Sequence, residues 1–135
     1  DPYGRLYTWY AVTDTRSVCP EGWHVPIDAD WTVLTDYLGG DYFAGGKLKE
    51  TGFTHWAESY SPATNETGFT ALPGGSRSPS GTFLQMGYNG SWWSATEKDA
   101  STAWYRLMDF LENSVTRDFF AFTKKHGLSV RCLKD

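Results

Sequence analysis

The sequence predicts a single domain of the α+β class, with helices early in the chain and antiparallel strands late. Its 135 residues fit one domain, residues 1–135, and leave little room for a second. One early segment has helical periodicity, whereas the last third of the chain contains segments that alternate along their length. The chain also holds 14 Gly and six Pro, which favours many short elements joined by ordered loops.

The first half of the chain contains one expected strand and two expected helices. Residues 5–12 are aromatic and roughly alternating, which predicts a strand. Residues 28–38 are predicted to form a helix, because their apolar residues fall on one face, Asp28 can cap the start and a Gly-Gly pair follows the end. A shorter helix is expected over residues 44–50, although two internal glycines disfavour it.

The second half begins with a long irregular stretch and then returns to strands. Residues 51–90 show no sustained helical or strand periodicity. Their aromatic rings are expected to be buried and to hold long ordered loops. Irregular stretches of this length in a compact domain are usually functional. Strands are predicted over residues 91–96 and 103–110, and a further pair over residues 114–122 and 128–133. Within 103–110, alternation puts Trp104, Met108 and Phe110 on the core side. Residues 105, 107 and 109 are then expected to face solvent.

The chain has two cysteines, Cys19 and Cys132, near its opposite ends. If they pair, the disulfide closes a loop of roughly 100 residues, worth on the order of 4 kcal/mol in the chain-entropy model. Such a bond indicates an oxidising, extracytoplasmic compartment. The alternative is a pair of free buried thiols in a cytosolic protein. Because the histidines stand at no metal-ligand spacing, no metal site is predicted.

Charge and hydropathy exclude two classes of partner. The net charge is −4 and no basic stripe is visible, so no nucleic-acid partner is expected. No run of 18 apolar residues occurs, so direct membrane insertion is not expected. The chain starts with Asp1 rather than Met, which suggests a mature fragment or an excised domain.

Several segments resemble the Fibrobacter succinogenes major paralogous domain, a family common in surface proteins of Bacteroidota. They run in order through nearly the whole chain and include GRLYTWYAV (4–12), CPEGWHVP (19–26), AGGKLK (44–49), TNETGFTALPGG (64–75), WWSATE (92–97), AWYR (103–106) and GLSVRC (127–132). The resemblance implies a C-type lectin-like fold: two helices, a twisted antiparallel sheet with long ordered loops, and adjacent termini. It also implies a bacterial or phage surface protein.

The chain departs from the family pattern at three places. Ile27 stands where a helix-capping Thr is usual, so Asp28 or Asp30 must satisfy the first helical amides. Residues 107–112 and 118–123 lack the usual Asn-, Ser- and Tyr-rich runs. These two segments are similar to the variable regions of proteins diversified by retroelements, which randomise adenine-containing codons. Ordinary drift in an exposed hairpin is the alternative.

Enzymatic and calcium-dependent functions are not predicted. The start of the first long helix is similar to that of the formylglycine-generating enzymes, but both cysteines are best explained as a terminal disulfide, which leaves no nucleophile. The Glu-Pro-Asn, Gln-Pro-Asp and Trp-Asn-Asp tripeptides of calcium lectins do not occur. No catalytic residue, metal ligand or cofactor is therefore expected.

The remaining hypothesis is a binding surface, because exposed aromatic and aliphatic groups beside acids are typical of protein contacts. The expected recognition face comprises Trp93, Tyr105, Leu107, Asp109, Leu111, Glu112, Thr116, Asp118, Phe119, Phe120 and Phe122. Its partner would be a protein or a cell-surface ligand, and its setting extracellular or on the cell surface, as part of a lipoprotein, a pilus or a phage fibre. A carbohydrate-binding lectin, a structural spacer, and phenylalanines that fill a loop-covered core are the alternatives.

Overall fold

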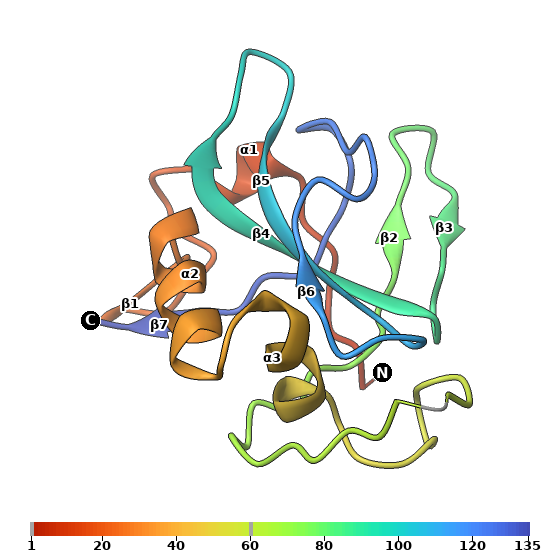
Figure 1. Ribbon diagram of the computed structural model, residues 1–135. Coiled ribbons are helices and arrows are strands. Elements are labelled where there is room, and N and C mark those ends of the chain that lie inside the picture. Colours follow the sequence, from red (N-terminus) through yellow and green to blue (C-terminus); the bar gives the residue numbers. More distant parts are fainter. Residues whose placement is uncertain (1, 60) are drawn as a thin grey trace.

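The computed structural model describes residues 2–59 and 61–135 and is organised around a three-stranded antiparallel sheet (Figure 1). Its order is β4 (Asn89–Glu97), β5 (Ala103–Asp109) and β6 (Val115–Thr116). Ser91 lies opposite Leu107, and Leu107 in turn lies opposite Thr116. The two predicted central strands are thus confirmed, and the α+β class with them.

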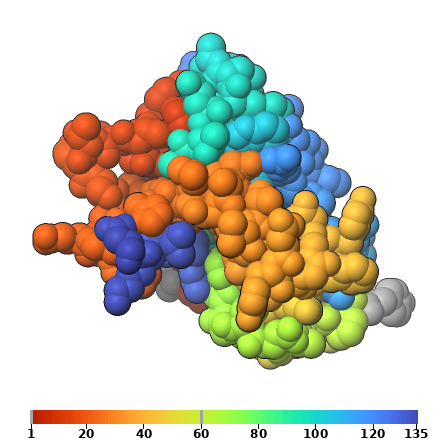
Figure 2. Space-filling model, turned by 60° about the vertical axis from the view of Figure 1, so that its left-hand side comes forward, coloured from red at the N-terminus to blue at the C-terminus, as the bar shows by residue number. Residues whose placement is uncertain are grey.

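Helices cover both faces of this sheet. α2 (Asp28–Tyr37) and α3 (Asp41–Leu48) pack on one face, where they contact β4, β5 and β6, and α1 (Trp9–Val12) contacts β4. Figure 2 shows α2 and α3 side by side on the surface of the molecule. The predicted helix over 28–38 is confirmed, while the one predicted over 44–50 begins earlier and ends at Leu48.

The strand predicted over residues 5–12 is wrong for its second half, where α1 lies. Tyr7 does pair with Leu128 across an antiparallel bridge. After it the chain makes one helical turn, which brings Val12 into the core and lets the Trp9 indole donate to the carbonyl of Ser94 at 2.9 Å. Aromatic alternation over so few residues cannot distinguish these two outcomes, because a strand and a single helical turn can each bring part of the segment against the core.

Two pairs of short strands complete the fold. β1 (Trp23–His24) pairs with β7 (Leu133–Lys134), and β2 (Ser76–Arg77) pairs with β3 (Phe83–Leu84). Of the strand predicted over residues 114–122, only β6 forms. Asp118 adopts a left-handed backbone conformation, with φ of 61°, which ends the extended run.

The sheet separates two hydrophobic clusters. Trp93, Tyr105 and Leu107 pack on the α1 side, together with Val12, Cys19, Val25, Ala103, Phe122 and Leu128. Trp92 and Met108 pack on the other side against α2 and α3, together with Trp31, Leu38, Ala44, Leu48, Trp56, Ala71 and Val115. Neither face of the central strands is open to solvent.

The two cysteines form a disulfide bond, which confirms the pairing of Cys19 with Cys132 over the alternative of two free thiols. Their Cα atoms lie 5.8 Å apart across a sequence separation of 113. The amide of Asp135 donates to the carbonyl of Gly22 at 3.0 Å. In Figure 2 the blue C-terminal end accordingly lies against an orange segment from the first part of the chain. Within the described ranges, no helix is long and apolar enough to cross a membrane.

Candidate functional site

Four members of the expected recognition face are buried, and for them the predicted exposure is wrong. Trp93, Tyr105, Leu107 and Phe122 are 0%, 1%, 2% and 8% exposed. The prediction assumed that residues alternate between a core side and a solvent side, but both sides of the sheet are covered. Thr116 also points inward enough for its hydroxyl oxygen to be enclosed, with no hydrogen-bond partner among the described residues.

The exposed and half-buried members fall into two groups rather than one face. Asp109, Leu111 and Glu112 lie at the turn between β5 and β6, whereas Asp118, Phe119 and Phe120 lie beside Tyr105 and the end of β4. Four residues of extended chain, about 13 Å, separate Tyr105 from Asp109 along β5. We call the first group the hairpin tip and the second the distal loop.

The main chain of the hairpin tip is fixed by its contact with α3. The amide of Gly45 donates to the carbonyl of Asn113 at 2.8 Å. A Cβ atom at Gly45 would lie 2.5 Å from the carbonyl oxygen of Ser114, and one at Gly46 would lie 2.7 Å from the Asn113 side chain. These two glycines disfavour a helix, yet they allow the hairpin to approach it closely. The low helix propensity of the two glycines is therefore offset by the packing of the hairpin against α3.

A buried lysine binds the main chain of the hairpin tip. Lys49 is 3% exposed, and its Nζ donates to the carbonyls of Asp109 at 2.9 Å and Glu112 at 2.7 Å. The ammonium also lies 5.4 Å from the centre of the Trp56 ring. Burial lowers the pKa of Lys49 to about 8, and the charge of Asp109 opposes that shift. Both hydrogen bonds reach main-chain oxygens, so they do not depend on which side chains the tip carries.

A pocket opens beside the hairpin tip, with a volume of about 240 Å³. Phe53, Trp56 and Phe110 form its apolar walls, and Lys49 lines it as well. At its rim, the Ser61 hydroxyl donates to the carbonyl of Leu111 at 2.7 Å. Leu111 itself is 57% exposed. The tip thus presents an apolar side chain next to a concave aromatic surface.

The distal loop is held in a similar way by Tyr105. The Tyr105 hydroxyl accepts from the amide of Phe120 at 2.6 Å and donates to the carbonyl of Phe120 at 2.7 Å. Burial raises the pKa of this hydroxyl to about 12. Phe120 is half-buried and stacks on Phe122, while Phe119 is 64% exposed. Phe122 and Phe120 therefore pack in or against the core that this loop covers, whereas Phe119 is exposed to solvent.

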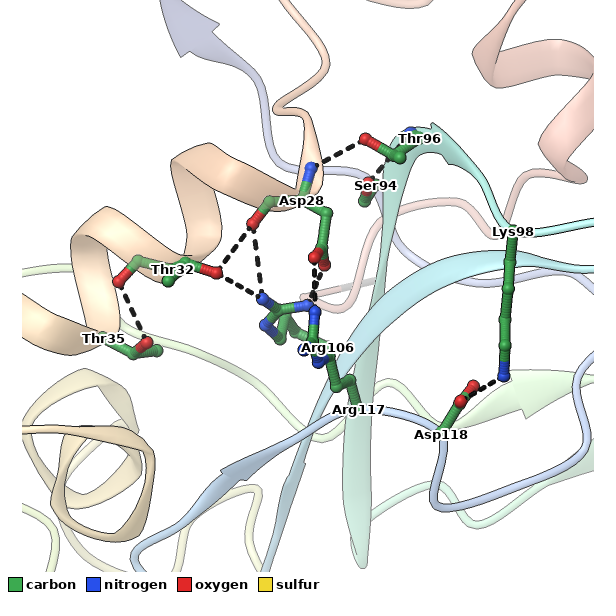
Figure 3. A network of polar contacts seen from close by, with 9 residues as sticks. All are labelled: Asp28, Thr32, Thr35, Ser94, Thr96, Lys98, Arg106, Arg117 and Asp118. Atoms are coloured by element: carbon green, nitrogen blue, oxygen red, sulfur yellow. Dashed lines mark hydrogen bonds and ion pairs between the residues drawn. The ribbon is translucent and has the colours of Figure 1, made fainter.

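Trp104 forms a cationic and aromatic cluster next to the distal loop. Lys98 Nζ and the Arg117 guanidinium each lie 4.7 Å from its ring centre. Lys98 also forms an ion pair with Asp118 (Figure 3). Charged groups that stack on a half-buried tryptophan are common at binding surfaces.

An ion-pair network connects this cluster to α2 (Figure 3). The Asp28 carboxylate binds the buried Arg106 guanidinium, and its second oxygen accepts from Arg117 at 2.6 Å. Asp28 therefore does not cap α2 with its side chain. The Asp30 carboxylate accepts from the amide of Ile27, just before α2 begins, at 2.9 Å. The first helical amide, that of Asp28, instead donates to the Thr96 hydroxyl at 2.9 Å, so the expectation that Asp28 or Asp30 would satisfy it is wrong.

The three histidines lie in separate parts of the structure. Each histidine has a local neighbour: His24 Nδ1 lies 2.6 Å from an Asp135 oxygen, and His55 Nδ1 lies 2.9 Å from a Glu50 oxygen. The amide of Thr123 lies 3.0 Å from His126 Nδ1. Across residues 2–59 and 61–135, no three His, Cys, Asp or Glu side chains cluster in a way that would hold a metal ion.

Sequence reasoning missed the residues that support the two loops. Nothing in the sequence distinguishes Lys49 from an ordinary surface lysine after a helix. The signal that existed was the excess of aromatic residues in 51–90, which pointed to buried rings such as Trp56 without showing what they would line.

Comparison with known proteins identifies the chain at the level of its family. No curated protein and no solved structure matches it significantly. The model of the Fibrobacter succinogenes major domain matches residues 1–134, which include both cysteines and both loops. The chain therefore belongs to the Fibrobacter succinogenes major domain family.

Proposed function

We propose that this domain is a non-enzymatic binding module of a surface protein, which recognises a protein or another cell-surface ligand. The proposed contact residues are Leu111 and Glu112 at the hairpin tip and Phe119 in the distal loop. We further propose a C-type lectin-like fold, which the family membership and the long ordered loops support. The disulfide is compatible with an extracellular setting.

One observation carries the proposal: exposed apolar side chains stand on loops whose main chains are held by other parts of the molecule. Leu111 and Phe119 are 57% and 64% exposed. Lys49 and Tyr105 hold the adjoining main chain through carbonyl and amide groups. An exposed apolar group on a positioned loop contributes to binding without first having to be ordered.

The same arrangement supports the hypothesis of retroelement diversification. Hydrogen bonds to main-chain groups persist when the outward side chains change. Close paralogues should then differ at Leu111, Glu112 and Phe119 and retain Lys49 and Tyr105. A nearby near-identical repeat rich in Asn codons would support this origin, whereas paralogues with identical loops would favour a structural spacer.

Flow cytometry of fluorescently labelled domain on bacterial and animal cells tests the function. Leu111→Asp and Phe119→Asp should each reduce cell binding at least tenfold and leave the melting temperature within about 2 °C. Val33→Asp is the matched control, because Val33 is 70% exposed on α2, which carries neither loop. Pretreating the cells with protease or with glycosidases then separates a protein ligand from a glycan. Equal binding by all three variants would reject the proposal.

A further inference from the structure

A second pocket, separate from both loops, is lined by two arginines. Arg5 and Arg77 line a cavity of about 330 Å³ formed by the N-terminal segment and the β2–β3 ribbon. The other four arginines are all engaged: Arg16, Arg106 and Arg117 bind Asp carboxylates, and Arg131 donates to a carbonyl at 2.7 Å. Among residues 2–59 and 61–135, neither the Arg5 nor the Arg77 guanidinium makes a hydrogen bond or an ion pair.

The pocket places Arg77 firmly and puts a ring beside it. Arg77 exchanges two main-chain hydrogen bonds with Gly127, at 2.9 and 2.8 Å. It lies opposite Phe83 in the β2–β3 pair, so the two side chains stand on the same face of the ribbon. Phe83 is 64% exposed and lines the cavity.

Tyr3 lines the cavity from the N-terminal segment. A Cβ atom at Gly74 would lie 3.6 Å from Tyr3 Cβ, an ordinary van der Waals distance, so the two segments pass side by side. Met86, which is 53% exposed, adds a further apolar wall. The cavity therefore combines two aromatic rings with two guanidinium groups.

The charge of the pocket is opposite to that of the whole chain. The chain carries 16 acidic residues against 12 Lys and Arg, yet none of the described residues that line this cavity is acidic. Guanidinium groups bind carboxylate, sulfate and phosphate through paired hydrogen bonds. Unpaired arginines in a concave site thus favour an anionic ligand.

We propose that this pocket binds an acidic sugar, namely a pyranose unit that carries a carboxylate or a sulfate group. The anion would pair with Arg5 and Arg77, and the C–H face of the sugar ring would pack on Phe83 or Tyr3. The volume is at the small end of the range for ligand pockets, which suits one or two sugar units. This site is independent of the hairpin tip and the distal loop.

Isothermal titration calorimetry of the intact domain with defined oligosaccharides tests the proposal. The probes are trigalacturonic acid, its fully methyl-esterified form, a sulfated chondroitin disaccharide and triglutamate. We expect one or both acidic sugars to bind with a Kd between about 1 μM and 1 mM. The methyl ester, which keeps the sugar rings but loses the charge, should bind at least tenfold more weakly than the acid. The stronger of the two acidic sugars identifies the anion as carboxylate or sulfate.

Single substitutions then locate the site. Arg5→Gln and Arg77→Gln should each weaken binding of the acidic sugar about tenfold, as expected for a lost charge-assisted hydrogen bond. Arg16→Gln removes the same charge from an arginine that is paired with Asp14, outside the pocket, and should change nothing. Circular dichroism confirms that each variant is folded.

Four results would overturn the proposal. The first two are failure of both acidic sugars to bind up to about 10 mM and equal affinity for the acid and its methyl ester. The third is tighter binding of triglutamate than of either sugar. The fourth is an equal loss of sugar affinity in Arg16→Gln and Arg77→Gln. Leu111→Asp should leave this binding unchanged, which separates the pocket from the proposed function of the loops.

Discussion

Replacing Lys49 by methionine tests whether this buried ammonium holds the hairpin tip in place. Methionine has nearly the same length but no donor, so the carbonyls of Asp109 and Glu112 would lose their hydrogen bonds at 2.9 and 2.7 Å. Each buried acceptor left without a partner costs about 1–3 kcal/mol. Removal of the buried charge offsets part of the combined cost of the two carbonyls. We expect a net loss of about 2–4 kcal/mol in the free energy of unfolding.

Thermal denaturation of the oxidised domain measures this loss. For a domain of this size, 1 kcal/mol corresponds to about 4 °C, so the melting temperature should fall by about 8–16 °C. Lys47→Met is the control, because the Lys47 side chain is half-exposed and forms a surface ion pair with Glu66 at 3.5 Å. That control should cost less than about 1 kcal/mol. Equal melting temperatures for the two variants would refute the anchoring role of Lys49.

The pH dependence gives an independent check of the same residue. Because the pKa of Lys49 is about 8 in the folded state and near the ordinary lysine value of 10.5 when unfolded, the unfolded state binds more protons between these values. The stability difference between the wild type and Lys49→Met should therefore increase as pH rises from 8 to 10. The raised pKa of Tyr105 acts only above pH 10 and is present in both proteins. A difference that is flat or falls over this interval would contradict the burial of the charge.

Three further predictions concern the frame. Replacing both Cys19 and Cys132 by alanine should lower the free energy of unfolding in urea by about 4–5 kcal/mol, and a loss below about 1 kcal/mol would exclude loop closure as the cause. Arg106→Met should cost about 2–3 kcal/mol, because the largely buried Asp28 carboxylate loses its buried partner and retains the exposed Arg117. Arg117→Ala should cost about 1 kcal/mol or less. Similar losses in chemical denaturation would mean that burial does not separate the two arginines. Gly45→Ala should lower the melting temperature, although alanine favours helices. The reason is that the new Cβ atom would lie 2.5 Å from a main-chain oxygen of the hairpin. An unchanged or raised melting temperature would show that the hairpin can move away.

The elements that the sequence predicted correctly depend on local periodicity. α2 was predicted to within one residue at its C-terminal end, because its apolar face and the following glycines are local signals. The central strands were predicted for the same reason. The strand predicted at 5–12 was wrong for its second half, because α1 is a single helical turn, too short for its periodicity to be told from that of a strand.

The candidate site was predicted less well than the fold. Leu111 and Phe119 are exposed as expected, but Leu107 and Tyr105 are buried. Alternation correctly assigned Leu107 and Met108 to opposite sides of β5. It could not show that α1 and its neighbours cover the second side, since that depends on how distant segments pack.

The amino-acid sequence by itself determined the class, the family and the main elements, because these follow from local pattern and from residue identity. The pairing of Cys19 with Cys132 was decided by the tertiary structure, which brings their Cα atoms to 5.8 Å. Only the tertiary structure decided which side chains reach solvent, and it divided the expected face into a hairpin tip and a distal loop. It also brought Lys49 into contact with the hairpin tip and Tyr105 into contact with the distal loop. Arg5 and Arg77 were brought to the same pocket. The physical reason is that exposure and electrostatic pairing depend on contacts between residues far apart in the chain, which periodicity does not encode.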